Sequence, residues 1–122
     1  MNQETIQING SVFSKDNFEQ LKKNDEATDS WENAIFLFLK NWFDDTDFVT
    51  THTSGSTGIP KEIRLAKTAM RNSARMTNAF FGLNEEKTAL LCLPASYIAG
   101  KMMLVRAITG GFNLITTAPK AN

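Results

Sequence analysis

Alternating apolar and polar residues near the start of the chain predict a β-hairpin. Residues 5–8 and 11–14 each place every second side chain on one face, as a half-buried strand requires. The dipeptide Asn9-Gly10 between them favours a two-residue turn. A short polar helix is expected to follow over residues 15–23.

Apolar residues at spacings of three and four then predict two longer helices. The first stripe consists of Trp31, Ala34, Ile35, Phe38, Leu39 and Trp42. It is typical of an amphipathic helix whose apolar side packs in a core or faces a partner domain. A second helix is expected over residues 67–81 and should end at Gly82. One face of that helix carries Ala66, Met70, Ala74, Thr77 and Phe81.

Between these helices, β-branched and aromatic residues predict a second hairpin. Residues 48–53 and 61–66 both have strand character, and only a short connection separates them. This hairpin is expected to form part of the main sheet.

The last third of the chain reads as strand, helix, strand. Residues 88–93 form a near-continuous apolar run, which predicts a strand covered on both faces, with Cys92 as a buried thiol. A helix over residues 98–108 and a strand over residues 112–117 follow. This order predicts a crossover between parallel neighbours. The expected fold class is therefore α/β, a mixed sheet with packed helices.

Composition fits one domain of 122 residues, of which 42% are hydrophobic. Residues 1–60 carry a net charge of −6 and residues 61–122 a net charge of +6, so the basic half would favour an anionic ligand, although a solvated surface is the commoner reason. The sequence contains no run of basic residues that would suggest nucleic-acid binding. No signal peptide or apolar run of membrane-spanning length is present, and one cysteine excludes an internal disulfide, so a cytoplasmic location is expected.

The segment from Thr53 to Lys61 carries the chemistry. Its sequence, Thr-Ser-Gly-Ser-Thr-Gly-Ile-Pro-Lys, combines hydroxyl groups, two glycines and a lysine. Glycine lets the backbone approach a ligand, and amides with hydroxyl groups can surround an anion. The spacing does not fit the Walker A motif, because Pro60 occupies the position of its second glycine. A solvated hairpin tip would explain the same composition.

This segment resembles the phosphate-loop signature of the adenylate-forming superfamily, which includes acyl-CoA synthetases, peptide-synthetase adenylation domains and luciferases. Residues 93–100, Leu-Pro-Ala-Ser-Tyr-Ile-Ala-Gly, are similar to a second family segment, in which many members have histidine where this chain has Tyr97. Residues 98–107 are most similar to the O-succinylbenzoate–CoA ligases of menaquinone biosynthesis.

The resemblance implies that a carboxylate attacks the α-phosphate of ATP and that the thiol of CoA then displaces AMP. It implies a phosphate site for ATP with Mg²⁺, formed by Ser54, Gly55, Ser56, Thr57, Gly58 and Lys61. It also implies that residues 1–122 are a partial N-terminal AMP-binding domain. In members of the family, the adenine-binding, ribose-binding and C-terminal parts follow the region that these residues resemble.

We therefore expect the chain alone to be inactive and to self-associate through surface left bare by truncation. The alternative is a complete, non-catalytic nucleotide- or phosphate-binding module. No catalytic residue or metal ligand is expected, since the lone His52 is more often structural than catalytic in such a position.

Tyr97 and Arg106 are candidate contacts of the carboxylate substrate. Lys101 and Arg106 are the only charged residues of the helix over residues 98–108. Either could face a substrate carboxylate, or both could extend to the surface along their apolar stems.

Overall fold

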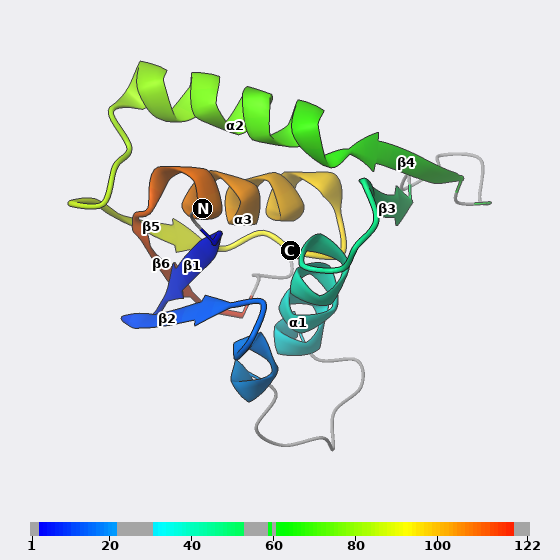
Figure 1. Cartoon of the computed structure of the whole chain (residues 1–122), viewed down its shortest axis with the longest axis horizontal. Helices are drawn as coiled ribbons and strands as arrows, with labels where there is room; N and C mark the ends of the chain where they lie inside the picture. Colours follow the sequence, from blue (N-terminus) through cyan, green and yellow to red (C-terminus); the bar gives the residue numbers. More distant parts are fainter. Residues whose placement is uncertain (1–2, 22–30, 53–58, 60, 119–122) are drawn as a thin grey trace.

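A computed structural model describes residues 3–21, 31–52, 59 and 61–118. The described chain forms strands, one 3₁₀ helix and three α-helices around one core (Figure 1). In chain order the elements are β1 (Thr5–Ile8), β2 (Ser11–Ser14), η1 (Phe18–Leu21), α1 (Trp31–Trp42), β3 (Phe48–His52), β4 (Glu62–Ala66), α2 (Lys67–Phe81), β5 (Thr88–Leu91), α3 (Ile98–Gly110) and β6 (Asn113–Thr116).

The main sheet is mixed, with the strand order β2-β1-β6-β5. Strand β1 pairs antiparallel with β2 and parallel with β6, and β6 pairs parallel with β5. The predicted turn between β1 and β2 is confirmed, since Asn9 and Gly10 have φ of 51° and 87°. The Asn9 side chain also binds β6, where it donates to Thr116 Oγ1 and accepts from the Thr116 amide at 3.0 Å each. The α/β class and the parallel crossover are confirmed.

The prediction that the second hairpin joins the main sheet is wrong. Strands β3 and β4 form a separate two-stranded antiparallel sheet. The antiparallel strand of the main sheet comes from the β1–β2 hairpin instead. Strand β4 runs without a break into α2, and Figure 1 shows α2 lying along α3, on the side of α3 opposite the four-stranded sheet. Local patterning identified both hairpins, but the choice of sheet neighbour depends on contacts far apart in the sequence.

Helix α3 lies between α2 and the main sheet (Figure 1). Helix α2 ends at Gly82 as expected, with φ 67°, and α3 ends at Gly111 with φ 78°. The predicted inner face of α2 is partly wrong, because Phe81 is 66% exposed. The buried positions are Lys67, Met70, Ala74 and Asn78. The Asn78 amide turns inward because it donates to the Arg106 carbonyl and to Thr109 Oγ1, at 3.0 and 2.9 Å.

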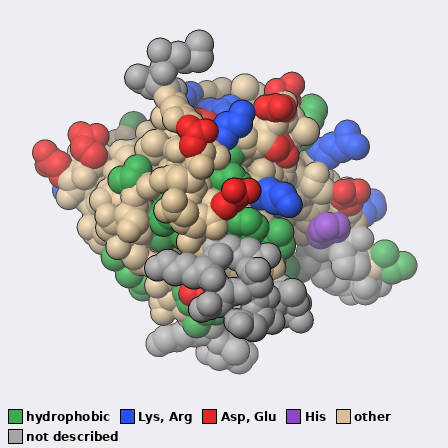
Figure 2. All heavy atoms as spheres, turned by 60° about the horizontal axis from the view of Figure 1, so that its bottom comes forward, with side chains coloured by type: hydrophobic (Ala, Val, Ile, Leu, Met, Phe, Trp, Pro, Cys, Tyr) green, Lys and Arg blue, Asp and Glu red, His purple; other side chains and the backbone are tan. Residues whose placement is uncertain are grey.

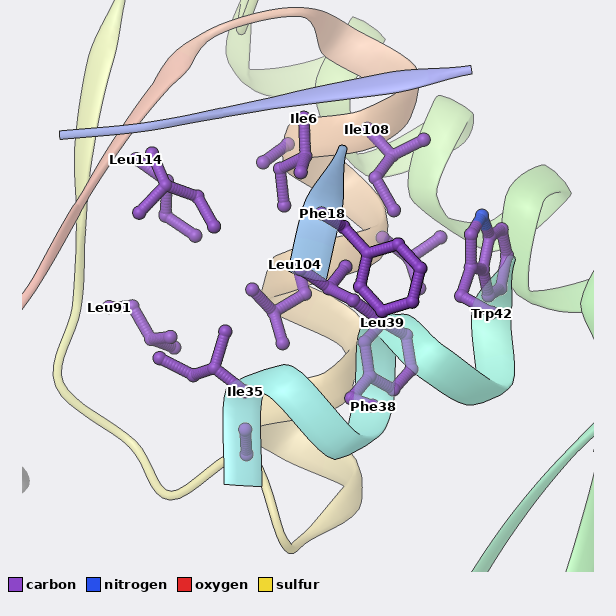
Figure 3. Close-up of a cluster of buried hydrophobic side chains, with 14 of the residues drawn as sticks. Ile6, Phe18, Ile35, Phe38, Leu39, Trp42, Leu91, Leu104, Ile108 and Leu114 are labelled. Atoms are coloured by element: carbon purple, nitrogen blue, oxygen red, sulfur yellow. The ribbon is translucent and has the colours of Figure 1, made fainter. Parts of the chain in front are cut away.

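The core lies between the main sheet, α3 and α1 (Figure 3). From α1 it receives Ile35, Phe38, Leu39 and Trp42, which confirms the predicted apolar stripe as core-facing. These side chains meet Ile6, Leu91, Leu104, Ile108 and Leu114 from the sheet and α3. Phe18 of η1 closes one side of this cluster.

The prediction of a β5 strand covered on both faces is wrong for the described chain. Leu91 is buried, whereas its neighbour Leu90 is 53% exposed and pairs with the partly exposed Ile115 on β6. Cys92 is also exposed, so the expected buried thiol is wrong. The apolar run gave no alternation, and therefore did not show that only one face is covered.

Acidic and basic side chains are interspersed over the face shown in Figure 2. The opposite charges of the two halves of the sequence therefore do not separate into two surfaces on this face. Within the described ranges, no helix has the length and apolar character needed to cross a membrane.

Candidate functional site

The predicted phosphate loop connects the two strands of the β3–β4 hairpin. Strand pairing runs from Phe48 opposite Ala66 to His52 opposite Glu62. Residues 53–61 must therefore span the distance between two adjacent strand ends. Thr51, one position before the strand end, is only 1% exposed, and its hydroxyl has no partner among the described residues.

One side of this hairpin is held by Asn41 at the end of α1. Its side-chain oxygen accepts from the Thr50 amide at 3.1 Å, and its amide group donates to the Phe48 carbonyl at 3.2 Å. The carboxamide thus replaces a neighbouring strand along the edge of β3. This contact fixes β3 relative to α1.

The base of the hairpin is held by Lys67, the first residue of α2. Its ammonium group is 2.8 Å from Asp44 Oδ1, 2.6 Å from the Thr46 carbonyl oxygen and 3.3 Å from the Asp44 carbonyl oxygen. Lys67 is buried at 4% exposure, so its charge is satisfied inside the protein. Burial alone would raise the pKa of Asp44, but hydrogen bonds from Lys67 and Thr46 outweigh it and hold that pKa well below its usual range.

Next to this contact, a cavity of about 540 Å³ opens between the end of α1 and the start of α2. Arg71 on its wall forms two hydrogen bonds with Glu4, at 2.8 and 2.9 Å, and lies 4.8 Å from the centre of the Trp42 ring. Trp42 Nε1 also donates to Glu4. The hydrogen bonds from Arg71 lower the pKa of Glu4. Because these groups satisfy one another, we interpret the cluster as structural.

Most of the predicted phosphate-binding residues fall outside the described ranges. Ser54, Gly55, Ser56, Thr57 and Gly58 lie outside the described residues. Lys61 is described, and it lies exposed immediately before β4. Within the described ranges, no group of three or more histidine, cysteine, aspartate or glutamate side chains is arranged to hold a metal ion.

The second predicted segment forms a tight turn at the start of α3. Tyr97 is the N-terminal flanking residue of that helix and is 50% exposed. Its amide donates to the Pro94 carbonyl at 3.3 Å, and its own carbonyl accepts from the Lys101 amide at 3.0 Å. The turn therefore fixes both peptide bonds of Tyr97 while leaving the ring half-exposed.

Tyr97 and Arg106, the two candidate substrate contacts, are not brought together. They are separated by nine positions along α3, about 13 Å along a helix axis and roughly half a turn around it. The Arg106 carbonyl accepts from Asn78 of α2, and the Arg106 Nε is buried without a partner among the described residues.

The surface alternative is wrong for Lys101, which is only 8% exposed. Its ammonium group donates to the Ala95 carbonyl at 2.8 Å, and burial lowers the pKa of Lys101. Sequence reasoning also missed the roles of Asn41 and Lys67. A lysine within an otherwise apolar helix was the one available signal for Lys101, whereas nothing local distinguishes Asn41 or Lys67 from surface residues.

Solved structures of other proteins share the fold of this chain. An acyl-CoA synthetase (AMP-forming)/AMP-acid ligase II-like protein from Dyadobacter fermentans DSM 18053 matches 84% of this chain at 34% identity, with a TM-score of 0.69. The chain has the N-terminal part of the adenylate-forming enzyme fold. No protein-family model and no curated protein matches the chain.

The o-succinylbenzoate CoA synthetase of Bacillus subtilis is a more distant structural neighbour. Its structure with the acyl-adenylate intermediate OSB-AMP matches 59% of this chain at 25% identity, with a TM-score of 0.52. Its structure with ATP and magnesium ion matches the same share, with a TM-score of 0.53. The chain spans 29% of the Dyadobacter protein and 15 to 19% of the Bacillus structures.

Proposed function

We propose that this chain is part of an ATP-dependent, AMP-forming ligase that joins a carboxylic acid to CoA. The observation that carries the proposal is the shared fold, at 34% identity over 84% of the chain. The loop with the adenylate-forming signature lies between two strands of that fold. Asn41 and Lys67 anchor those strands, so the loop is attached to a fixed base.

In this proposal the loop holds the triphosphate of ATP. The residues that would do so are Ser54, Gly55, Ser56, Thr57, Gly58 and Lys61. Backbone amides and hydroxyl groups at these positions would donate hydrogen bonds to phosphate oxygens, and the exposed Lys61 would add positive charge at the foot of the loop. Mg²⁺ would supply further charge to the phosphates. The contribution of the loop is positioning and electrostatic stabilisation.

We further propose o-succinylbenzoate as the acid, which would place the enzyme in menaquinone biosynthesis. The likeness to the Bacillus enzyme, crystallised with the corresponding acyl-adenylate, supports this choice. Tyr97 would contact the acid from the half-exposed position at the start of α3. Arg106 is the weaker candidate of the two, because its Nε atom is buried, whereas Tyr97 is half-exposed. A cytoplasmic location, where ATP and CoA are available, completes the proposal.

Acid-dependent exchange of pyrophosphate into ATP tests the function. In the complete enzyme, exchange should require the acid, with o-succinylbenzoate preferred over other aromatic acids. Lys61→Ala should reduce the exchange rate at subsaturating ATP, whereas Lys87→Ala, which also removes an exposed lysine, should not. Equal rates for the two variants would contradict the phosphate role of Lys61. Equal exchange with all acids would contradict the substrate choice.

The purified 122-residue chain should give no exchange, because residues that bind adenine and ribose are expected outside it. Exchange by this chain alone would refute that part of the proposal. Calorimetric titration with ATP separates the ligase from a self-contained binding module. Weak or no binding supports the ligase, and tight binding supports the module.

A further inference from the structure

The turn between β5 and α3 packs unusually closely against the first turn of the helix. A Cβ atom on Gly100 would lie 2.1 Å from the Pro94 carbonyl oxygen and 2.9 Å from Ala95 Cα. Real Cβ atoms do not approach other atoms this closely. Ala95 is buried at 2% exposure. The turn therefore rests directly on the helix backbone, in the space that only a glycine leaves open.

Among the described residues, Lys101 provides the one side-chain hydrogen bond between this turn and α3. Its ammonium group reaches back over Gly100 to the Ala95 carbonyl at 2.8 Å. Among the described residues, no carboxylate forms an ion pair with it. A buried ammonium without a counter-ion is costly, whereas a methionine would fill a similar volume without that cost. The residues that follow in the helix are in fact Met102, Met103 and Leu104. What lysine adds is a donor that holds the turn.

We infer that Lys101 is a positioning residue that fixes the Pro94–Tyr97 turn on α3 and thereby sets the placement of Tyr97. The Lys101 ammonium holds Ala95, and the Lys101 amide holds the Tyr97 carbonyl. The Tyr97 amide is bound to Pro94. The Tyr97 backbone is thus held on both sides, by Pro94 in the turn and by Lys101 in the helix. Contact between the turn and the helix in turn requires the Lys101 side chain and the glycine at position 100.

The sequence provides a direct probe of this turn, because Tyr97 is the only tyrosine. Protein labelled with ¹⁵N-tyrosine gives one backbone amide signal. Hydrogen exchange at that amide measures opening of the turn. A second sample labelled with ¹⁵N-leucine provides the Leu104 amide, inside the same helix, as the reference for opening of the helix and of the whole fold.

Lys101→Met should accelerate exchange at Tyr97 by about tenfold relative to Leu104, as expected for loss of a hydrogen bond from a charged group. Lys101→Arg, which keeps the donor and the charge, should exchange more slowly than Lys101→Met. Lys87→Met, the same substitution at an exposed site, should leave the ratio unchanged. An unchanged ratio in Lys101→Met would overturn the inference. So would an arginine variant that exchanges as fast as the methionine variant, since packing alone would then explain the effect.

The consequence for catalysis rests on the proposed function. In the complete enzyme, Lys101→Met should raise the KM for the acid and leave the KM for ATP nearly unchanged. If the Tyr97 amide exchanges faster but the KM for the acid does not change, Lys101 still positions the turn and the assignment of Tyr97 to the acid site is wrong. If neither changes, the positioning role is wrong.

Discussion

Replacing Gly100 with alanine should destabilise the protein by about 2 kcal/mol, although alanine is the better helix former. The new Cβ would lie 2.1 Å from the Pro94 carbonyl oxygen and 2.6 Å from the carbonyl carbon. Both are backbone atoms, so no side-chain rotation relieves the clash and the turn must move away from α3. Overpacking of this kind costs up to about 3 kcal/mol. The higher helix propensity of alanine offsets about 1 kcal/mol.

Thermal unfolding followed by circular dichroism measures this loss. For a domain of this size, about 2 kcal/mol lowers the melting temperature by roughly 8 °C. Gly110→Ala is the matched control at the other end of the same helix. There the first atom that a Cβ would meet is Asn78 Nδ2 at 2.8 Å, a side-chain atom whose displacement strains its two hydrogen bonds to α3 but leaves the backbone in place. The control should therefore lose less than half as much. Equal losses at the two glycines would refute the claim that the turn is rigidly seated on α3.

Three further predictions concern buried and exposed polar groups. Lys67→Met should lower the urea midpoint, because Asp44 and the carbonyl of Thr46 lose their partner, and a midpoint equal to that of the wild type would contradict the anchoring role. Arg71 lowers the pKa of Glu4 in the folded state, so their contact stabilises the protein above about pH 4.3, and this stabilisation is lost as the pH falls below that value. Arg71→Met should therefore flatten the dependence of stability on pH in urea titrations at pH 3 to 6. Cys92 is exposed, so its reaction with a thiol reagent in the folded protein should be within about tenfold of the rate in urea, and full protection would contradict its placement.

Periodicity predicted the elements well because their patterns are local. The stripe from Trp31 to Trp42 specified α1 and its buried side, and Asn9-Gly10 specified the first hairpin. Gly82 marked the end of α2. In each case the determining residues lie within a few positions of one another, so their meaning does not depend on the rest of the chain.

Predictions failed where the outcome depends on distant partners. The apolar run around Leu90 gave no information on which face α3 covers, and the exposed Cys92 follows from the same error. Strand β3 carries suitable residues for a large sheet, yet its free edge is bound by Asn41 of α1. A polar side chain that acts as a substitute strand has no sequence signature.

At the candidate site, too, local features could be predicted and distant contacts could not. The string from Thr53 to Lys61 is local, so its resemblance to the adenylate-forming signature is visible without a structure. The supports of the site come from elsewhere, with Lys67 binding across the hairpin base and Lys101 binding back over the helix start. A single charged residue in an apolar helix does not reveal its acceptor, and Lys101 could therefore be expected equally at the surface or at a substrate.

Lys67 and Lys101 make the same kind of contact but differ in whether a carboxylate balances their charge. Each is a buried lysine that donates to a backbone carbonyl of a preceding turn. Lys67 has Asp44 as a counter-ion, so its charge is balanced inside the chain. Lys101 has no such partner among the described residues, and burial lowers its pKa. The folded state therefore binds the Lys101 proton less tightly than the unfolded state does. Stability should consequently rise as the pH approaches about 10.4 from below, and this rise should be absent in Lys101→Met. Since the Lys67 charge is balanced by Asp44, Lys67→Met should retain the rise. An identical alkaline profile for the wild type and Lys101→Met would show that the Lys101 charge is balanced by a group that the described chain does not reveal.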